Sequence, residues 1–527
     1  MKWLMTNVSI LFHCSTVPMF NRDAKAPRFV SLMYTPNLDE ARQLTTRGNL
    51  CPVYREVAAD LETPVSAYLK VARGRHSFLL ESVEGGERLA RYSFMGTEPY
   101  RVLRSGPSPA FNESSGDPLV AIEDELRRFR VAPVPGLPRF HGGAVGYLSY
   151  EVARYFEPRL PIPEADPLGL PEAIFLFTDT LLVFDHLQHR IKVVTHCRLD
   201  GDIDAAYRQA VWRIEELVGR LARPLTALPY RQEAPAAAQP GAVASNVSRE
   251  DYLAKVERCK EHIVAGDIYQ VQISQRFQRP TFAHPFEVYR ALRTVNPSPY
   301  MYYLELGDLQ IVGASPEMLV RVEDGLVETH PIAGTRRRGR DFEDERRMEE
   351  ELRTDEKERA EHIMLVDLAR NDIGRISQPG TVKVTQLMEV ERYSHVMHLV
   401  SHVVGRLRAE MTSYDVLRAC FPAGTVSGAP KIRAMEIIAE LESDCRGPYA
   451  GAVGYFDLSG NLDSAITIRT IVMKDGVAYA QAAGGIVFDS VPELEYMETQ
   501  NKAQALLRAI EQAEATAEEV PKGSLGY

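Results

Sequence analysis

Residues 360–375 read AEHIMLVDLARNDIGR, and this stretch marks where a charged helix turns into the core of the protein. The preceding residues 341–359 (DFEDERRMEEELRTDEKER) alternate acidic and basic side chains, as a solvated helical face does. From His362 onward apolar residues dominate, so Glu361 stands at the boundary. A carboxylate buried there costs free energy unless a metal ion or another cation compensates its charge.

Glu361 belongs to one of two Glu-x-x-Glu pairs, Glu358/Glu361 and Glu495/Glu498. Residues three apart share a helical face, so each pair can present two carboxylates to one point. Mg²⁺ prefers oxygen ligands and commonly takes one or two carboxylates together with an anionic substrate. The alternative for each pair is an ordinary salt-bridged surface. The position of Glu361 favours a metal site shared by two facing helices.

Three stretches rich in glycine and threonine are interpreted as loops: residues 332–336 (IAGTR), 424–431 (GTVSGAPK) and 483–487 (AGGIV). Exposed backbone N–H groups in such loops bind anions. None of the three matches GxxxxGK[ST], so the sequence does not predict a nucleoside triphosphate site. Each stretch, taken by itself, is also compatible with a simple turn.

Alternation along residues 394–404 predicts a strand with His398 and His402 on one face and His395 on the other. A histidine aimed into a pocket serves as acid or base near neutral pH, whereas a core histidine is the alternative. Arg469 interrupts the apolar, strand-like run AITIRTIVM and requires an anion as its partner. Residue chemistry alone therefore predicts a Mg²⁺ site beside anion-binding loops, for a small carboxylated molecule.

Bulk composition narrows the class of protein. The chain of 527 residues has a formal charge of −11, with 45% hydrophobic and 25% charged residues. Such an acidic balance argues against nucleic acid or an anionic membrane as the main partner. The six cysteines show no CxxC spacing, which suits a reducing compartment, and no apolar run reaches the roughly 18 residues of a membrane span. We expect a cytoplasmic protein whose opening segment is an upstream start or a disordered extension; a cleaved signal peptide is the alternative.

Strand-like and helical segments alternate irregularly, which predicts an α+β fold. Pro, Ala and Gly dominate residues 224–247 and suggest a linker or mobile loop. Ser248 is the expected N-cap of the helix that follows. The pentapeptide GAVGY occurs at 143–147 and at 451–455, for which similar tight strand packing is a sufficient explanation. Earlier elements are predicted as helices at 39–47, 64–71, 120–130 and 203–221, and strands at 77–81, 173–184 and 191–195.

Several stretches together, in consistent order, resemble the chorismate-utilising enzymes. They are IVGASPEMLV (311–320), HPIAGTRRRG (330–339), AEHIMLVDLARNDIGR (360–375), FPAGTVSGAPK (421–431) and EYMETQNKA (495–503). The N-terminal part, with LLES (79–82), and NPSPYMYY (296–303) are similar to large subunits of anthranilate synthases. The resemblance implies packed antiparallel sheets flanked by helices. It also implies this division of the chain: an extension at 1–35, a regulatory part at 36–223, a linker at 224–247, a catalytic part at 248–515 and a tail at 516–527.

The same resemblance implies roles for individual residues. Glu361 and Glu498 match the family's Mg²⁺ ligands, with Glu358 and Glu495 as supporting carboxylates. The expected contacts to chorismate come from Gly334, Thr335, Tyr449, Arg469, Ala483, Gly484 and Gly485. Many relatives read Gly-Ala-Gly where this chain has Ala483-Gly-Gly, and because backbone N–H groups do the binding, we expect the role to survive.

Two positions discriminate within the family. Aminodeoxychorismate synthases usually carry a nucleophilic lysine where this chain has Ala333, and isochorismate synthases place a water-activating lysine at the position of Gln270. Without either lysine, the resemblance favours ammonia as the nucleophile. Glu317 matches the acid that assists loss of the C4 hydroxyl, and His398 matches the histidine of the elimination of pyruvate. With Glu358, Gln270 and Thr425 these residues form the expected catalytic set.

The implied activity is that of an anthranilate synthase, which makes anthranilate and pyruvate from chorismate. No glutaminase signature (GxCxGxQ with a distant HxE) is present, so a separate glutamine amidotransferase subunit is expected to supply ammonia, in a heterotetramer of two large and two small subunits. LLES and PYM resemble a tryptophan feedback site, which designates Glu81, Ser82, Pro299, Tyr300 and Met301. The alternatives are an aminodeoxychorismate or aminodeoxyisochorismate synthase, and a non-catalytic tryptophan-binding relative.

Overall fold

The computed structural model describes residues 34–82, 91–108, 111, 116–163, 165–225, 241–393 and 396–519. Most of the expected N-terminal extension and tail, the middle of the expected linker, and His395 lie outside the described residues. The start of that tail is helical, because the last helix continues to Glu519. No helix in the described ranges is both long and apolar enough to cross a membrane.

Two large sheets form the framework, and every pairing between their named strands is antiparallel. The larger sheet runs in the order β1 (Leu50–Ala58), β8 (Arg190–Arg198), β7 (Thr180–Asp185), β3 (Tyr92–Thr97), β2 (His76–Glu81), β11 (Tyr300–Leu306), β12 (Leu309–Ser315), β21 (Thr470–Lys474), β22 (Val477–Ile486), β10 (Gln270–Pro280) and β18 (Gly428–Ala429), with β9 (Ala244–Ser245) also paired to β10. The smaller sheet runs β15 (Ile332–Arg337), β17 (Val396–Arg406), β14 (Leu326–Thr329), β13 (Met318–Glu323), β20 (Leu462–Ile466), β19 (Ala452–Asp457), β5 (Gly143–Leu148), β6 (Ala173–Thr178) and β4 (Arg101–Ser105), with β16 (Lys383–Arg392) also paired to β17.

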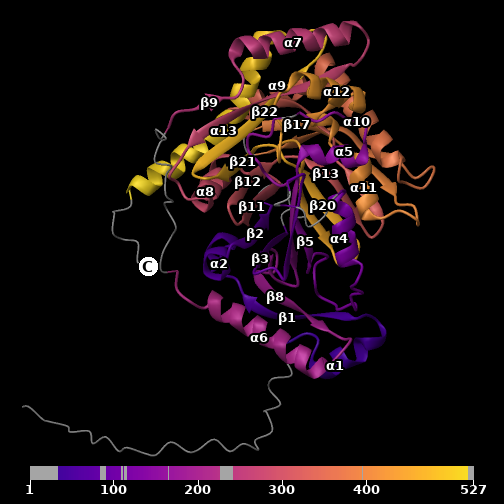
Figure 1. Ribbon diagram of the computed structural model, residues 1–527, viewed down its shortest axis with the longest axis vertical. Helices are drawn as coiled ribbons and strands as arrows, with labels where there is room; N and C mark the ends of the chain where they lie inside the picture. Colours follow the sequence, from indigo (N-terminus) through magenta and orange to yellow (C-terminus); the bar gives the residue numbers. More distant parts are fainter. Residues whose placement is uncertain are drawn as a thin grey trace, which may run out of the picture.

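Helices cover the outer faces of both sheets, and Figure 1 shows α7 at one end of the molecule and α6 and α1 at the other. The α-helices are α1 (Leu38–Gln43), α2 (Pro64–Val71), α4 (Pro118–Leu126), α5 (Ala153–Phe156), α6 (Ile203–Leu221), α7 (Arg249–Val264), α8 (Pro285–Val295), α9 (Phe342–Thr354), α10 (Glu356–Gly374), α11 (Ser413–Cys420), α12 (Lys431–Leu441) and α13 (Pro492–Glu519). Short 3₁₀ turns are η2 (Leu44–Thr46), η4 (Tyr150–Val152) and η5 (Gly424–Val426). The expected α+β fold with packed antiparallel sheets and flanking helices is confirmed.

Both sheets contain strands from before and after residues 224–247, so the two halves of the chain share one framework. A cluster of buried side chains from both sheets fills the space between them, including Phe78, Tyr147, Leu176, Tyr302 and Val453. In Figure 1 the early, purple strands β2 and β3 lie beside the later strands β11 and β12. A site built at the junction of the sheets therefore draws on both halves.

Some locally encoded elements match their predicted bounds, whereas the helices predicted at 39–47 and 120–130 are α1 (Leu38–Gln43) and α4 (Pro118–Leu126). Helices α2 and α6 begin and end where expected, and Ser248 caps α7 by accepting the N–H of Asp251 at 3.1 Å. The two GAVGY stretches are neighbouring strands, β5 and β19, with Gly146 opposite Gly454. A Cβ atom at either glycine would collide with the backbone of the next strand, at Ile174 or Asp463 respectively. Tight strand packing thus accounts for the repeat.

The prediction of a single strand over residues 173–184 is wrong. The run divides at Asp179 into β6, which belongs to the smaller sheet, and β7, which belongs to the larger one. Both strands are almost entirely buried, and the polar residues Thr178, Asp179 and Thr180 stand where the chain crosses from one sheet to the other. Similar crossings occur between β12 and β13, at Pro316–Glu317, and between β20 and β21, at Thr467–Arg469.

Candidate active site

The two Glu-x-x-Glu pairs lie on helices, as predicted: the first on α10 and the second near the start of α13. Glu361 accepts a hydrogen bond from Nε2 of Gln270, the first residue of β10, at 2.8 Å. Burial raises the pKa of Glu361, the bond from Gln270 opposes the rise, and the charges of Glu358 and Glu498 add to it. The influence of Glu498 places the acidic ends of α10 and α13 within electrostatic range of each other.

The carboxylates of α13 differ in their surroundings. Glu495 accepts a hydrogen bond from the Ser490 hydroxyl at 2.7 Å, and its Oε2 is buried without a hydrogen-bond partner in the described part of the chain. Burial and the nearby Glu498 raise the pKa of Glu495 to about 7. Burial also opposes ionisation of Glu498, but the ammonium of Lys502, 2.6 Å away, outweighs it and lowers the pKa of Glu498.

The prediction that four carboxylates converge on one ion stays a prediction. Among the described residues, no three acidic, histidine or cysteine side chains lie close enough together to hold a metal. Arg336 pairs with Glu358 at 3.0 Å, and the Ser490 hydroxyl donates to one oxygen of Glu495, so each of these carboxylates has a partner within the described chain. Glu361 with its raised pKa and the unpartnered oxygen of Glu495 still fit a divalent cation, since Mg²⁺ needs only one or two protein carboxylates beside water and substrate oxygens.

Residues 483–485 form part of strand β22 and not a loop, which corrects the prediction. Gly484 and Gly485 lie opposite Ile273 and Gln272 of β10. A Cβ at Gly484 would lie 3.1 Å from Oε2 of Glu495, so this strand runs directly beside the acidic cluster. The pairing of β21 with β22 ends at Ala480, so the backbone groups of the next residues on that side are released from the sheet.

Tyr449 and Lys502 occupy this released edge. Tyr449 is buried, its pKa is raised to about 12 by burial, and a hydrogen bond from the Ala483 N–H opposes the rise. Nζ of Lys502 donates to the Ala483 carbonyl at 2.8 Å. Because hydrogen-bonding direction alternates along a strand, the N–H of Gly485 points to the same side. Backbone N–H groups of residues 483–485 can therefore still bind an anion, as predicted, although these residues lie in a strand and not in a loop.

Arg469 lies in the crossing between β20 and β21 and not inside a strand, so its predicted environment is corrected. Its φ of 52° is left-handed, an uncommon conformation for a residue with a side chain. One guanidinium nitrogen donates to the Lys502 carbonyl at 2.5 Å. Burial lowers the pKa of Arg469, opposed by the charges of Tyr449 and Glu498. Strain at a half-buried cation beside an open strand edge is typical of a binding site.

Lys502 was not designated from the sequence, although it links Glu498, Ala483 and Arg469. The signal available was its spacing, because Lys502 follows Glu498 by four residues and lies on the same helical face. Ser490, whose hydroxyl donates to Glu495, could not be identified from the sequence pattern, because it precedes α13 and is not part of the helical spacing.

Gly334 and Thr335 lie in strand β15, where a loop was predicted. The strand is irregular at this point: its register shifts between Ala333 and Thr335, and Gly334 has a φ of 68°. This bulge turns the Gly334 carbonyl toward Nδ1 of His398, at 2.9 Å, while the Thr335 hydroxyl lies 3.1 Å from the same nitrogen. The strand prediction is confirmed for β17, where His398 and His402 share a face.

His398 and His402 have different surroundings. Burial lowers the pKa of His398, the hydrogen bond to Gly334 opposes this shift, and the charge of Arg469 reinforces it. His402 stacks on His330 with 3.8 Å between ring centres, so it is part of the packing between β17 and the start of β15. Only His398 is placed beside the residues designated for substrate.

Glu317 lies in the crossing between β12 and β13 and is buried. Burial raises its pKa to about 8, and the neighbouring Thr425 hydroxyl and Ile332 backbone oppose the rise. Glu317 and Thr425 line one hollow together with residues of α10 and α11. The end of β12, just before Glu317, contacts the crossing that contains Arg469. The N–H of Ala314 donates to the Arg469 carbonyl at 3.0 Å.

The five residues designated for tryptophan line one hollow between the sheets. Glu81, Ser82, Pro299, Tyr300 and Met301 contribute to it, opposite strands β19 and β20 of the smaller sheet. The hollow has a volume of about 100 Å³. The structure therefore brings the designated residues together at a place separate from the acidic helices.

Comparison with known proteins adds independent information. The family model for chorismate binding enzymes matches residues 75–508. An anthranilate synthase component 1 from Acetivibrio thermocellus is 51% identical over 495 residues, covering 91% of this chain and 99% of that relative. The crystal structure of anthranilate synthase component I from Streptococcus pneumoniae is similar with a TM-score of 0.71 and 38% identity, covering 86% of this chain and 99% of that one. The menaquinone-specific isochorismate synthase from Escherichia coli (TM-score 0.65, 19% identity, 90% and 98% covered) shares the fold.

Proposed function

The chain belongs to the family of chorismate-binding enzymes, and on this basis we propose that it converts chorismate and ammonia to anthranilate and pyruvate, as the large component of an anthranilate synthase. The observation that carries the proposal is its similarity to anthranilate synthases along nine tenths of its length. The geometry of the site supplies the residues that the reaction needs, and each is considered in turn.

Ammonia is the nucleophile, because no amine of the enzyme is placed to attack among the site residues that the structure describes. Ala333, at the position of a nucleophilic lysine in aminodeoxychorismate synthases, is buried in β15. Gln270 uses its amide to hold Glu361 and has no basic nitrogen with which to activate water. Lys502 is engaged by Glu498 and the Ala483 carbonyl, and Lys357 is exposed on the first turn of α10. An external amine therefore fits this site better than attack by the enzyme or by water.

Chorismate is a dianion, and the site offers it cationic and N–H donors. Arg469 and Tyr449 face the released edge of β22, where the N–H of Gly485 is available to a carboxylate. Gly334 and Thr335 form a second group together with His398, which lies within electrostatic range of Arg469. Mg²⁺ held by Glu361 and Glu498, with Glu358 and Glu495 supporting, would supply further charge for a substrate carboxylate. Fixed donors on two sides orient the ring for attack.

In the first half of the reaction, ammonia forms a bond to C2, the ring double bonds shift and the C4–O bond breaks. Hydroxide is a poor leaving group, so an acid must protonate it as it departs, giving water. Glu317 is the group suited to this role, because burial keeps its carboxyl protonated at neutral pH. Thr425, which contacts that carboxyl, orients it. The incoming nitrogen loses its extra proton to solvent or to a nearby base.

In the second half, the C2 proton leaves, the C3–O bond breaks and the ring becomes aromatic. The enolpyruvate that departs takes up a proton to become pyruvate. His398 is assigned as the base for the C2 proton. Its Nδ1 must donate to the Gly334 carbonyl, which can only accept, so in the neutral ring Nε2 keeps a free lone pair. The lowered pKa of His398 maintains that neutral form.

Three further features belong to the same proposal. A glutamine amidotransferase component would supply ammonia, since the chain has no glutaminase signature of its own, and a heterotetramer is the expected assembly. Tryptophan would bind the hollow lined by Glu81, Ser82 and Tyr300 and inhibit the enzyme. The chain would act in the cytoplasm, where chorismate chemistry and reduced cysteines are compatible.

The test is incubation of the full chain with chorismate, Mg²⁺ and an ammonium salt at alkaline pH. Blue anthranilate fluorescence with equimolar pyruvate is expected. Accumulation of a non-aromatic amino compound would contradict the assignment and would point to an enzyme that stops at the intermediate. No consumption of chorismate, together with tight tryptophan binding, would identify a non-catalytic relative.

A further inference from the structure

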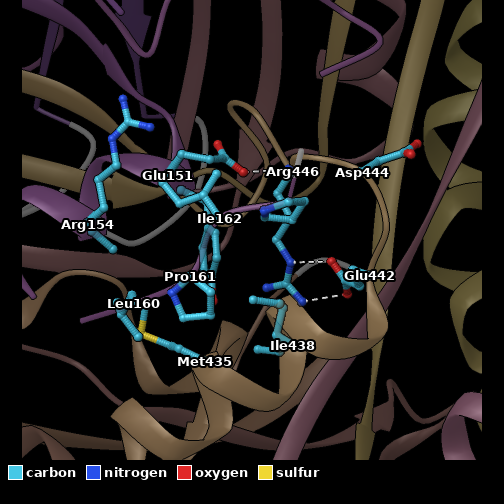
Figure 2. Close-up of a pocket in the computed structure, with 14 residues that line it drawn as sticks. Glu151, Arg154, Leu160, Pro161, Ile162, Met435, Ile438, Glu442, Asp444 and Arg446 are labelled. Carbon is cyan, nitrogen blue, oxygen red and sulfur yellow. Dashed lines mark hydrogen bonds and ion pairs between the residues drawn. The ribbon is translucent and has the colours of Figure 1, made fainter. Parts of the chain in front are cut away.

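Arg446 is among the most completely buried side chains of the described chain, at 2% exposure. It follows α12, and Figure 2 shows its guanidinium lying against Glu442 beneath a hollow lined by Pro161 and Ile438. Nε and Nη2 donate to the two carboxylate oxygens of Glu442 at 2.8 and 2.7 Å. This is a bidentate ion pair in the interior, where an unpaired charge would be very costly.

The remaining donors of Arg446 reach two other elements. Nη1 donates to the Val426 carbonyl at 2.8 Å, and Nη2 donates to the Gln272 carbonyl at 2.7 Å. Val426 directly follows Thr425, which contacts the proposed acid. Gln272 lies two residues after Gln270, whose amide holds Glu361. One guanidinium thus sets the spacing between η5 and the start of β10, two segments that carry site residues.

A third segment is held by the same side chain and its neighbours. The guanidinium lies 4.6 Å from the centre of the Tyr150 ring and 5.8 Å from that of Tyr449. The backbone N–H of Arg446 donates to Glu151 at 2.6 Å, and that of Gly447 donates to the other oxygen at 3.1 Å. Glu151 therefore anchors the turn that leads to Tyr449, and Figure 2 shows its carboxylate directed at Arg446.

Glu442 extends the network into β10. Its Oε1 accepts the backbone N–H of Ser274 at 2.7 Å and the Ser274 hydroxyl at 3.0 Å. The pair Arg446–Glu442 consequently fixes β10 from two residues, through Gln272 and Ser274. None of these groups belongs to the substrate-binding residues named above, so their effect on the reaction is indirect.

We propose that Arg446, paired with Glu442, is a positioning residue that sets the relative placement of Thr425, Gln270 and Tyr449 for the reaction. The planar fork of arginine makes four directed hydrogen bonds at once, which a lysine ammonium in the same place cannot reproduce. Misplacement of catalytic groups by about 1 Å costs about 10²-fold in rate. This inference rests on the proposed function of the site.

The test compares Arg446→Lys with Arg276→Lys in the full chain. Arg276 is also buried, and it joins β10 to the same segment through Asp444 at 2.8 Å and the Cys445 carbonyl at 3.3 Å, but it contacts no proposed site residue. Loss of chorismate absorbance is followed, so no particular product is assumed. Thermal unfolding gives the folded fraction of each variant. The double substitution Arg446→Met with Glu442→Gln, which leaves no buried charge, is measured alongside.

Arg446→Lys and the double variant are expected to lower kcat about 10²-fold per folded molecule, with a smaller change in KM for chorismate. Arg276→Lys should keep the kcat of the unaltered chain while losing comparable thermal stability. Equal kcat values for Arg446→Lys and Arg276→Lys per folded molecule would overturn the proposal. So would a double variant that does not fold, because Arg446 would then serve the fold itself. Failure of the unaltered chain to consume chorismate would instead overturn the proposed function.

Discussion

Glu317, the proposed acid, shows how the surroundings of a side chain change its acidity. Its place in the crossing between β12 and β13 removes it from water, and burial raises its pKa from the ordinary value of 4.5 to about 8. A carboxyl with this pKa is protonated at neutral pH and can act as an acid. The same residue in an exposed turn would be ionised and unable to protonate a leaving hydroxyl.

A pH dependence follows from this pKa. At a constant concentration of unprotonated ammonia, kcat is expected to fall as the pH rises through about 8, because Glu317 loses its proton and with it the ability to act as an acid. Glu317→Gln should lower kcat by about 10²–10⁴-fold and abolish this alkaline limb. Anthranilate fluorescence at buffered pH values measures both. An alkaline limb that persists unchanged in Glu317→Gln would assign the titration to another group.

Glu361 and Glu498 are predicted to determine the response to Mg²⁺. Glu361→Gln should reduce Mg²⁺-dependent turnover by about 100-fold or more and weaken Mg²⁺ binding measured by calorimetry. Glu356→Gln is the matched control, because Glu356 is exposed on the first turn of the same helix. Equal Mg²⁺ binding by the unaltered chain and Glu361→Gln would remove this residue from the metal site.

At the scale of elements, the irregular strand β15 is the feature that brings His398 and the Gly334 carbonyl together. Gly334 has a φ of 68°, and a Cβ there would lie 2.8 Å from Leu352 and 3.3 Å from the Glu358 carboxylate. A bulge re-aims backbone groups locally, and such bulges are frequent beside active sites. The glycine is therefore required by both the backbone conformation and the space.

Gly334→Ala is expected to destabilise the protein by about 1–3 kcal/mol and to lower kcat. Gly325→Ala is the control for conformation alone, since Gly325 has a φ of 74° in the turn between β13 and β14 with nothing within 4 Å of its Cβ position. Denaturant unfolding and initial rates are measured for both. A kcat in Gly334→Ala equal to that of Gly325→Ala would show that the bulge serves only the fold.

At the scale of the whole molecule, the hollow proposed for tryptophan is lined by strands of both sheets. Tyr300 of β11 donates a hydrogen bond to Asp463 of β20 at 3.1 Å, so strands of both sheets meet in its wall. β11 leads through β12 to the crossing of Glu317, and β20 leads to that of Arg469. A ligand that changes the separation of the sheets at the hollow would therefore act on both crossings.

Ser82→Leu should raise the tryptophan concentration needed for half-inhibition at least about tenfold, because the larger side chain fills the hollow. Activity without tryptophan should remain close to that of the unaltered chain. Ser459→Leu, in the exposed turn between β19 and β20, is the control. Unchanged tryptophan inhibition in Ser82→Leu would place the inhibitor elsewhere.

The sequence by itself determined the elements whose pattern is local. The carboxylates of α10 and α13, the cap of α7 and the strand of His398 all follow from spacing over one or two turns or strand repeats. The short motifs also identified the family. Residues 36–223 and 248–515 were separable in sequence, yet they share both sheets.

Only the tertiary structure decided where the chain crosses between sheets and what lies at the crossings. Residues 173–184 and the stretch around Arg469 each carry polar residues inside a strand-like run, and the local pattern does not distinguish a crossing from a single strand, because a strand buried in either sheet has the same composition. Pairing with strands distant in sequence determines where the chain leaves one sheet for the other. Pairing with β10 likewise places residues 483–485 in β22, where a loop was predicted. The partners of Arg446 likewise come from α12, η5 and β10, so its role depends on distances that no local pattern encodes.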